Sequence, residues 1–341
     1  MADDKEESPF GPPPGFPKID YPVNPRENLD LVFAHKTPYW VPVFMVETNF
    51  VWDPADNERP YPLNSSGKDW FGTTWEYVPD AGAQMVPPKT HICPDPRSWR
   101  EKLIFPDLDK IDFGKDKAKM APMFDNSSKY NMYVMQNGMF ERLLDMSDSM
   151  EVFIWLKEEP EDAIEYANAM ADYKIKVLDR IIDEWVPIDF FALSDDWGTQ
   201  HAPFMSPDMY ARIFYEPTKR IADHIHARGL GVNQHSCGKL EGIVPYIANF
   251  ADVWEGQNMN DKVMIKKKYG DRLAMTISPD PAVLQNPDST EAEVVKAVRD
   301  SIDTYGEGGG MFMFGFGATP VITETVIRET FAYSRKKYGK V

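Results

Sequence analysis

Cysteine is scarce in this sequence of 341 residues, which contains only Cys93 and Cys237. Two cysteines argue against a disulfide framework and favour a reducing compartment. The chain also lacks a run of about 18 apolar residues that could span a membrane. Its acidic start, Met1 to Glu7, has no apolar signal core. These absences predict a cytoplasmic protein with no membrane association.

Positive charge is in short supply as well. The chain has 37 Lys and Arg against 54 Asp and Glu, which gives a formal net charge of −17. This charge repels polynucleotides and anionic lipid surfaces, and no basic stripe interrupts it. We therefore expect no nucleic acid partner. The length suffices for one large barrel or two ordinary domains with a substantial core.

Proline marks the beginning of the chain. Residues 8–25 contain Pro12, Pro13 and Pro14 together with four more prolines. Proline disrupts the hydrogen bonding of both helices and central strands. We therefore predict a proline-rich arm over residues 1–25, either draped over the body or disordered. Residues 26–341 then form a single folded unit.

Apolar strands and amphipathic helices alternate through that unit. The clearest helical pattern runs from Pro160 to Trp185, with apolar residues three and four positions apart. Strands are predicted near residues 41, 84, 131, 189, 229, 251, 273 and 310, and the second of these has the weakest signal. Eight strand and helix units favour an α/β protein folded as a single (β/α)8 TIM barrel. A doubly wound sheet is the alternative.

Polar residues follow many of these strands. In a barrel the carboxyl ends of the strands meet at one mouth, where the chemistry takes place. Each of these residues also has a structural explanation when taken singly, such as a solvated loop acid. The residues expected at the mouth are Glu47, Asn137, Asp195, Asp196, His235, Cys237, Glu255 and Gln257.

The strand near residue 229 ends in a potential pair of metal ligands, His235 and Cys237. Residues i and i+2 of an extended segment point to the same side, so both side chains can reach one ion. Imidazole and thiolate are ligands that zinc prefers. A packed cysteine beside a hydrogen-bonded histidine is the simpler alternative. The glycine that follows, Gly238, lets the chain turn away.

Aromatic residues are frequent outside the regular pattern, particularly between residues 53 and 100. Trp75 lies in this irregular segment, while Trp52, Trp197 and Phe316 follow or precede predicted strand ends. The segment either forms a lid or pocket wall or packs as a satellite cluster under a long loop.

The motifs resemble the uroporphyrinogen decarboxylase superfamily, and within it the cobamide-dependent methyltransferase branch. The resemblance extends from Glu27 to about Tyr333. It is most specific over residues 195–200, Ser206-Pro207 and residues 235–238, with a weaker match at residues 268–270. The decarboxylases carry an arginine-rich segment after the first strand, whereas this chain has Met45 to Phe50 there, without arginine. Porphyrinogen decarboxylation is therefore disfavoured.

The resemblance implies a zinc ion held by His235 and Cys237. The methyltransferase branch commonly has a further cysteine after the last strand, but residues 315–317 of this chain are Gly-Phe-Gly. An acid could complete the site, with Glu47, Asp195 and Glu255 as the choices and Glu47 preferred over Glu255. Replacing a thiolate leaves the ion more positive, which suits activation of an ether oxygen.

The resemblance therefore predicts an enzyme that moves a methyl group from a methoxylated, aromatic donor to the cobalt of a separate corrinoid protein. Asp195 or Asp196 would donate a proton to the leaving oxygen. A methylcobamide:thiol methyltransferase, a non-catalytic scaffold subunit and a tetra-acid decarboxylase remain as alternatives. The residues expected to contact the substrate are Trp75, Asn137, Trp197, Gln200, Gln257 and Phe316.

Overall fold

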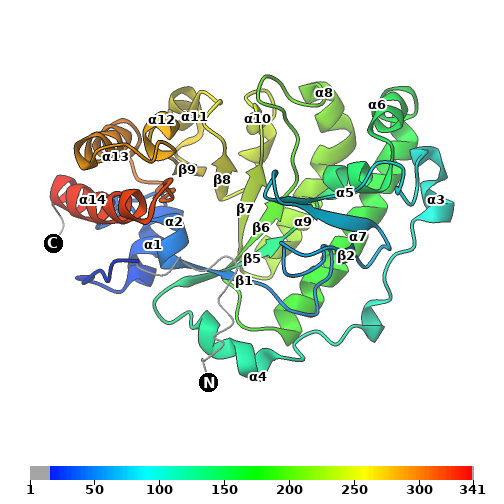
Figure 1. Ribbon diagram of the computed structural model, residues 1–341, viewed down its shortest axis with the longest axis horizontal. Coiled ribbons are helices and arrows are strands. Elements are labelled where there is room, and N and C mark those ends of the chain that lie inside the picture. Colours follow the sequence, from blue (N-terminus) through cyan, green and yellow to red (C-terminus); the bar gives the residue numbers. More distant parts are fainter. Residues whose placement is uncertain (1–15, 340–341) are drawn as a thin grey trace.

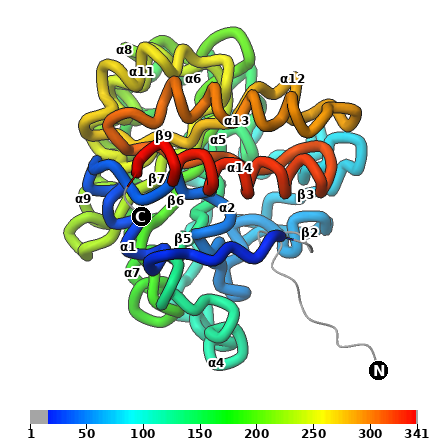
Figure 2. The backbone as a smooth tube through the Cα atoms, turned by 90° about the vertical axis from the view of Figure 1, so that its left-hand side faces the viewer, coloured from blue at the N-terminus to red at the C-terminus, as the bar shows by residue number. Residues whose placement is uncertain are grey.

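A computed structural model describes residues 16–339 of the chain. The first 15 residues of the predicted arm therefore lie outside the described residues. Residues 16–24 run without helix or strand alongside helix α14 (Pro320–Tyr338) (Figure 2). Tyr21 stacks on Trp40 and packs edge-on against Phe331 of α14. This part of the arm is draped over the body, one of the two outcomes expected from its prolines.

A curled parallel sheet forms the centre of the described structure (Figure 1). Its strands are neighbours in the order in which the chain visits them. Parallel pairing between consecutive strands requires a crossover each time, and helices supply most of these connections. The strands are β1 (Thr48–Val51), β5 (Tyr130–Met135), β6 (Phe190–Ser194), β7 (Gly231–Ser236), β8 (Val253–Gly256), β9 (Ala274–Ile277) and β10 (Met311–Met313).

Helices pack on the outer face of this sheet (Figure 1). The predicted helix from Pro160 to Trp185 is confirmed as α7 (Pro160–Glu184). The remaining helices are α1 (Pro25–Phe33), α2 (Phe44–Glu47), α3 (Trp99–Lys102), α4 (Lys117–Met120), α5 (Met139–Met146), α6 (Ser149–Glu158), α8 (Pro207–Tyr210), α9 (Glu216–Ala227), α10 (Val244–Ile247), α11 (Lys262–Tyr269), α12 (Pro281–Leu284) and α13 (Glu291–Tyr305). Within residues 16–339, no helix is both long enough and apolar enough to cross a membrane.

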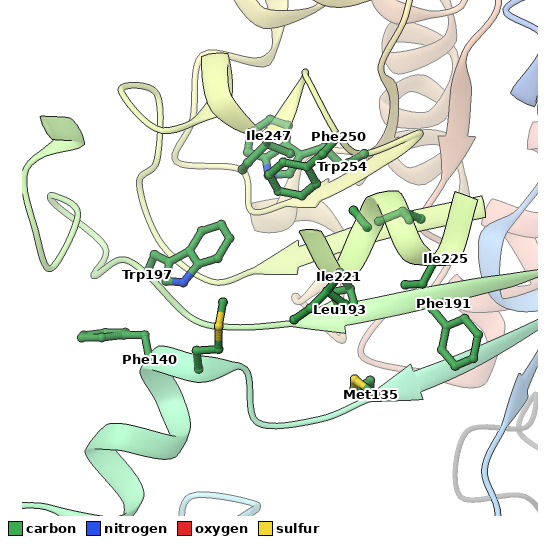
Figure 3. Packing of buried hydrophobic residues seen from close by; sticks show 14 of the residues in the cluster. Met135, Phe140, Phe191, Leu193, Trp197, Ile221, Ile225, Ile247, Phe250 and Trp254 are labelled. Carbon is green, nitrogen blue, oxygen red and sulfur yellow. The ribbon is translucent and has the colours of Figure 1, made fainter. Parts of the chain in front are cut away.

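Alternation along the strands separates two apolar clusters. One face of the strands packs against the helices, as Figure 3 shows for Phe191 and Leu193 of β6 near Ile221 and Ile225 of α9. The other face encloses a smaller interior cluster, to which α1 contributes two side chains. The buried members of the interior cluster are Leu29, Val32, Phe44, Met132, Phe190, Ala192, Val253, Ala274 and Phe312.

The first strand begins later than predicted. It was expected near residue 41, but Phe44–Glu47 make one helical turn, and β1 starts at Thr48. The hydroxyl of Thr48 donates to the carbonyl of Phe44 and the Glu47 carboxylate accepts from the Val43 N–H, and both bonds hold this turn. Val43 nevertheless bridges Met313 of β10 in parallel. The chain therefore brings the last strand against the segment leading into β1.

The strand predicted near residue 84 is not part of this sheet. It forms β4 (Ala83–Met85) in a separate antiparallel sheet with β3 (Thr74–Val78) and β2 (Gly67–Lys68). These short strands belong to the long connection between β1 and β5, so their pairing is local. The α/β class with a barrel-like parallel sheet is confirmed, with seven strands in the sheet formed by residues 16–339.

Two buried ion pairs fix the connection between β1 and β5 to the helices. Asp69 pairs with Arg142 of α5, and Glu58 pairs with Lys174 of α7. Arg142 also donates to the carbonyl of Glu58. Charges this far from water require partners, and each group here has one. The connection is thus held against the carboxyl end of β5.

Candidate metal centre

The inward face of the strands carries polar side chains beyond the interior cluster. On β6, Phe190 and Ala192 point inward, and the same alternation brings Asp196 to the inner side of the mouth. On β7 the inward positions lead from Asn233 to His235 and then to Cys237. On β8 they lead from Val253 to Glu255. The sheet itself thereby gathers an imidazole, a thiol and two carboxylates.

Asp196, His235 and Cys237 form the tightest group of potential metal ligands in residues 16–339. Each offers one ligand atom, and these atoms all lie within 4.8 Å of one another. The Cys237 sulfur lies 3.7 Å from His235 Nε2, and Asp196 Oδ1 lies 3.8 Å from the same nitrogen. Asp196 Oδ1 also accepts from the Cys237 backbone N–H at 2.6 Å. The loops after β6 and β7 are therefore joined at the cluster.

Two glycines allow this close approach of the loops. Gly238 has a φ of +94°, in the left-handed region, and a Cβ there would lie 2.2 Å from the carbonyl carbon of Gly198. A side chain at Gly238 would be strained by its backbone conformation and would also clash with that backbone. The glycine expected to turn the chain after Cys237 does so while touching the loop of Asp196.

Glu255 holds the other side of the imidazole. Its Oε1 lies 3.4 Å from His235 Nδ1, and its Oε2 accepts from Asn233 Nδ2 at 3.0 Å. A carboxylate on one ring nitrogen orients the ring and leaves the other nitrogen available as a ligand. Nε2 is the nitrogen that faces Cys237 and Asp196. Glu255 therefore acts behind the imidazole in this arrangement.

Electrostatics couple these groups. Burial alone would lower the pKa of His235, but the Glu255 carboxylate and the Cys237 thiol outweigh burial and raise that pKa well above its usual value. Burial would raise the pKa of Glu255, whereas the His235 imidazolium lowers it below its usual value. Burial raises the pKa of the Cys237 thiol. A cation bound to His235 Nε2 and Cys237 Sγ would replace the protons on these two atoms.

The donor set suits a borderline-soft divalent ion. Imidazole, thiolate and carboxylate are the three ligand types that zinc accepts in tetrahedral sites. Three protein ligands leave a fourth position for a substrate atom, which is the arrangement of catalytic sites. His235, Cys237 and Asp196 are the residues that could hold such an ion.

The structure does not bring Glu47, the preferred third ligand, to this cluster. Its Oε1 accepts from Trp40 Nε1 at 2.9 Å and its Oε2 accepts from the Val43 N–H. The acid is the last residue of the unexpected turn α2 and does not stand at a strand end. Burial raises the pKa of Glu47 to about 7, despite these bonds.

Asp195 faces the helices instead of the mouth. Its two oxygens accept from the backbone N–H groups of Phe140 and Glu141 in the first turn of α5. Burial raises its pKa to about 6. A Cβ on Gly138 would lie 2.1 Å from the Asp195 side chain, which explains the glycine at the start of α5. Asp195 therefore caps a helix, and its neighbour Asp196 occupies the cluster.

Gln257 is the one member of the expected substrate-contacting group that touches the cluster. Its Nε2 donates to the Cys237 sulfur at 3.3 Å. Trp197 is fully buried against Tyr210, so it belongs to the outer core. Gln200 is exposed on the turn after β6. Phe316 packs against Phe16 of the arm and lines a cavity of about 180 Å³ with it.

Trp75 and Asn137 belong to a polar layer between the long connection and α5. Trp75 Nε1 donates to Asp69 at 3.0 Å, and the guanidinium of Arg59 stacks 4.6 Å from the Trp75 ring. Arg59 Nε donates to Asn137 Oδ1 at 2.5 Å, and its Nη2 lies 3.5 Å from Glu141. Of the two explanations offered by the sequence, a cluster under a long loop fits Trp75 better.

Sequence reasoning missed Asp196 as a ligand and Asn260 as a partner of the site. Strict period-two alternation from Ala192 would have chosen Asp196 over Asp195 for the inward side. Asn260 lies in the loop after β8 and has no signal of this kind. Its contacts depend on how that loop folds back on the loop after β7.

The part of the chain that carries Asp196, His235 and Cys237 matches a known family. Residues 140–336, more than half of the chain, match the family model of uroporphyrinogen decarboxylase (URO-D). The chain belongs to this family. No curated protein matches it in a direct sequence search.

The fold is similar to that of a methyltransferase from Methanosarcina mazei. The two share 15% sequence identity with a TM-score of 0.58, over 93% of this chain and 99% of the other. A chitinase from Chromobacterium violaceum, at 8% identity, and the catalytic domain of GH30 xylanase C from Talaromyces cellulolyticus, at 10%, both reach a TM-score of only 0.35. Each covers 64% of this chain, with 83% and 57% of their own lengths. Scores this low carry no functional argument.

Proposed function

We propose that the protein is a corrinoid-dependent methyltransferase that takes a methyl group from an O-methyl donor, a methoxylated aromatic compound, and transfers it to the cobalt of a separate corrinoid protein. The observation that supports this proposal most directly is the cluster of Asp196, His235 and Cys237 at the mouth of a URO-D family fold. The fold shared with the methyltransferase from Methanosarcina mazei is consistent with this activity.

In this proposal His235, Cys237 and Asp196 would hold a zinc ion. When bound there, zinc would supply Lewis acidity for an ether oxygen. Glu255 keeps the imidazole oriented through Nδ1, and Asn233 in turn holds Glu255. The sequence led us to expect a carboxylate in place of the second thiolate. In this proposal that carboxylate is Asp196 and not Glu47.

The transfer itself breaks the bond between the methyl carbon and the ether oxygen and forms a bond between that carbon and the reduced cobalt, which supplies the electron pair of the new bond and is thereby oxidised. The electron pair of the broken bond stays on the oxygen, which therefore needs positive charge or a proton. Asp195 cannot serve as the donor while both of its oxygens bind α5. Asp196 would be held as a carboxylate by the ion, so the positive charge for the leaving oxygen would come from zinc.

The charge at the mouth disfavours decarboxylation of a tetra-acid. Asp196, Glu255 and Glu141 lie there, and the segment of residues 45–50, where the decarboxylases carry arginine, has none. Arg59 is already engaged with Asn137 and Glu141. A neutral methoxylated ring meets no such repulsion.

The test is to incubate the purified chain with a panel of methoxyarenes and a reduced corrinoid protein, and to record methylcobalt absorbance. Formation of methylcobalt with a methoxyarene supports the proposal, and no transfer from any O-methyl donor contradicts it. Methylation of a thiol from methylcobamide would select the thiol methyltransferase instead. Turnover of either kind removes the scaffold alternative. Release of carbon dioxide from a tetra-acid would select decarboxylation.

A further inference from the structure

Two side-chain amides join the loops that follow β7 and β8. Gln257 Oε1 accepts from the Gly238 N–H at 2.8 Å while its Nε2 donates to the Cys237 sulfur. Asn260 Oδ1 accepts from the Leu240 N–H at 2.6 Å. Its Nδ2 donates to the carbonyls of Gly238 and Gln257 at 2.9 and 3.0 Å. The loop that carries Cys237 is thus bound on both sides of Gly238.

The two amides differ in exposure. Asn260 is 5% exposed, and all of its side-chain hydrogen-bonding atoms have partners in the two loops. Gln257 is exposed, yet both ends of its amide are used by consecutive residues of the other loop. An exposed glutamine would be free to sample other rotamers. Asn260 holds the backbone carbonyl of Gln257 in place. The two hydrogen bonds of the Gln257 side chain therefore depend on Asn260.

We propose that Gln257 and Asn260 are positioning residues, which hold the Cys237 sulfur at the spacing required to share one divalent ion with His235 and Asp196. This inference rests on the metal site of the proposed function and adds to it the group that determines the geometry of the thiolate. Such outer partners commonly contribute tenfold to hundredfold in metal affinity. The hydrogen bond that Gln257 Nε2 donates to the Cys237 sulfur also withdraws electron density from that sulfur, which keeps the bound ion more electrophilic.

The first measurement needs no metal. Residue-resolved hydrogen exchange on the metal-free chain reports the N–H groups of Gly238 and Leu240. In Asn260→Ala both should exchange faster, roughly tenfold for the loss of one well-formed hydrogen bond. The Lys239 N–H, which donates to the Thr199 carbonyl at 2.8 Å, lies between them and serves as an internal reference. Should Asn260→Ala fail to fold, Asn260→Asp replaces it. This variant keeps an acceptor for Leu240 and loses the donors, so only the Gly238 N–H should exchange faster.

The second measurement uses Co²⁺ as the probe. Gln257→Leu loses both contacts and should bind Co²⁺ about tenfold or more weakly. Its thiolate-to-cobalt charge-transfer band should move to longer wavelength, because the sulfur no longer receives a hydrogen bond. Gln257→Glu retains an acceptor for the Gly238 N–H and loses the donor to sulfur. It should therefore keep normal exchange at Gly238 and still show the band shift. Gln285→Leu, an exposed glutamine after α12, is the matched control.

The two measurements separate the inference from the proposed function. Unchanged exchange in the Asn260 variant, or unchanged Co²⁺ affinity and band position in Gln257→Leu, would overturn the positioning role even if methyl transfer is found. If the unaltered protein binds no Co²⁺, the metal site fails and the role of the amides in metal binding fails with it. Normal metal binding with no methyl transfer would leave the positioning role standing and reject the proposed reaction.

Discussion

Asp195 and Asp196 are consecutive residues whose carboxylates serve opposite sides of the strand end. Asp195 accepts from two N–H groups at the start of α5, whereas Asp196 accepts from the Cys237 N–H at the mouth. Side chains alternate along an extended segment, so adjacent acids after β6 cannot both face the cluster. The pair therefore acts as a helix cap and a candidate ligand.

This division of roles predicts opposite effects of the same substitution. Asp195→Asn should lower the free energy of unfolding by about 1 to 2 kcal/mol, because a charged cap at a helix N-terminus is weakened, and leave zinc content unchanged. Asp196→Asn should lose zinc while unfolding normally, since the amide oxygen can still accept from Cys237. Metal analysis and denaturant unfolding on both variants decide this. Zinc loss in Asp195→Asn with full retention in Asp196→Asn would reverse the assignment.

The two cysteines provide a second matched comparison. Cys237→Ser should remove metal and activity together, because a hydroxyl is a poor ligand for zinc, while the fold remains intact. Cys93 is fully buried and is not a member of the ligand cluster. The Cys93 thiol donates to the Asp95 carbonyl at 3.2 Å, and a serine hydroxyl can make the same bond, so Cys93→Ser should cost at most about 1 kcal/mol and keep its metal. Full zinc retention and normal turnover in Cys237→Ser would reject the metal mechanism.

Glu47 predicts a pH dependence of stability. Burial raises its pKa from 4.5 to about 7 in the folded chain. Between these values the folded state holds more protons than the unfolded state, so the free energy of unfolding falls as pH rises. The contribution of Glu47 to this fall reaches about 3 kcal/mol once the pH exceeds 7.

The measurement compares urea unfolding of the unaltered protein with that of Glu47→Gln at pH values below 4.5 and above 7. Glutamine does not titrate, so the variant should become relatively more stable as the pH rises. Glu76→Gln, which alters an exposed residue of β3, should follow the unaltered protein. A stability difference for Glu47→Gln that is independent of pH would contradict the prediction.

The ion pair of Asp69 and Arg142 predicts a large effect of removing one charge. Both side chains are 0% exposed. Arg142→Met should cost about 3 to 5 kcal/mol because it leaves a buried carboxylate without its cation. Arg100→Met removes a surface cation that pairs with Glu165 and should cost less than about 1 kcal/mol. Thermal and urea unfolding of the two variants test this. Equal losses in the free energy of unfolding would contradict the prediction that buried Asp69 requires its cation.

Much of the sheet could be predicted because periodicity is local. The alternation of strands and helices identified the parallel sheet from near residue 131 onwards, and the i, i+2 spacing of His235 and Cys237 placed both on one side. A strand does form near residue 84, but its assignment to the parallel sheet was wrong, because a short apolar run does not reveal its pairing partner. There the paired residues of β3 lie only five to nine positions away along the chain.

The sequence alone determined the class of fold, the strand that carries His235 and Cys237, and the glycine that turns the chain after them. These features follow from chain-local chemistry: side-chain period, ligand type and backbone freedom. Only the tertiary structure decided that Asp196 rather than Glu47 joins the pair, that Glu255 stands behind the imidazole, and that Asn260 joins two loops. Such choices depend on which loops meet in space, and contacts between residues far apart in the chain leave no periodic signal in it.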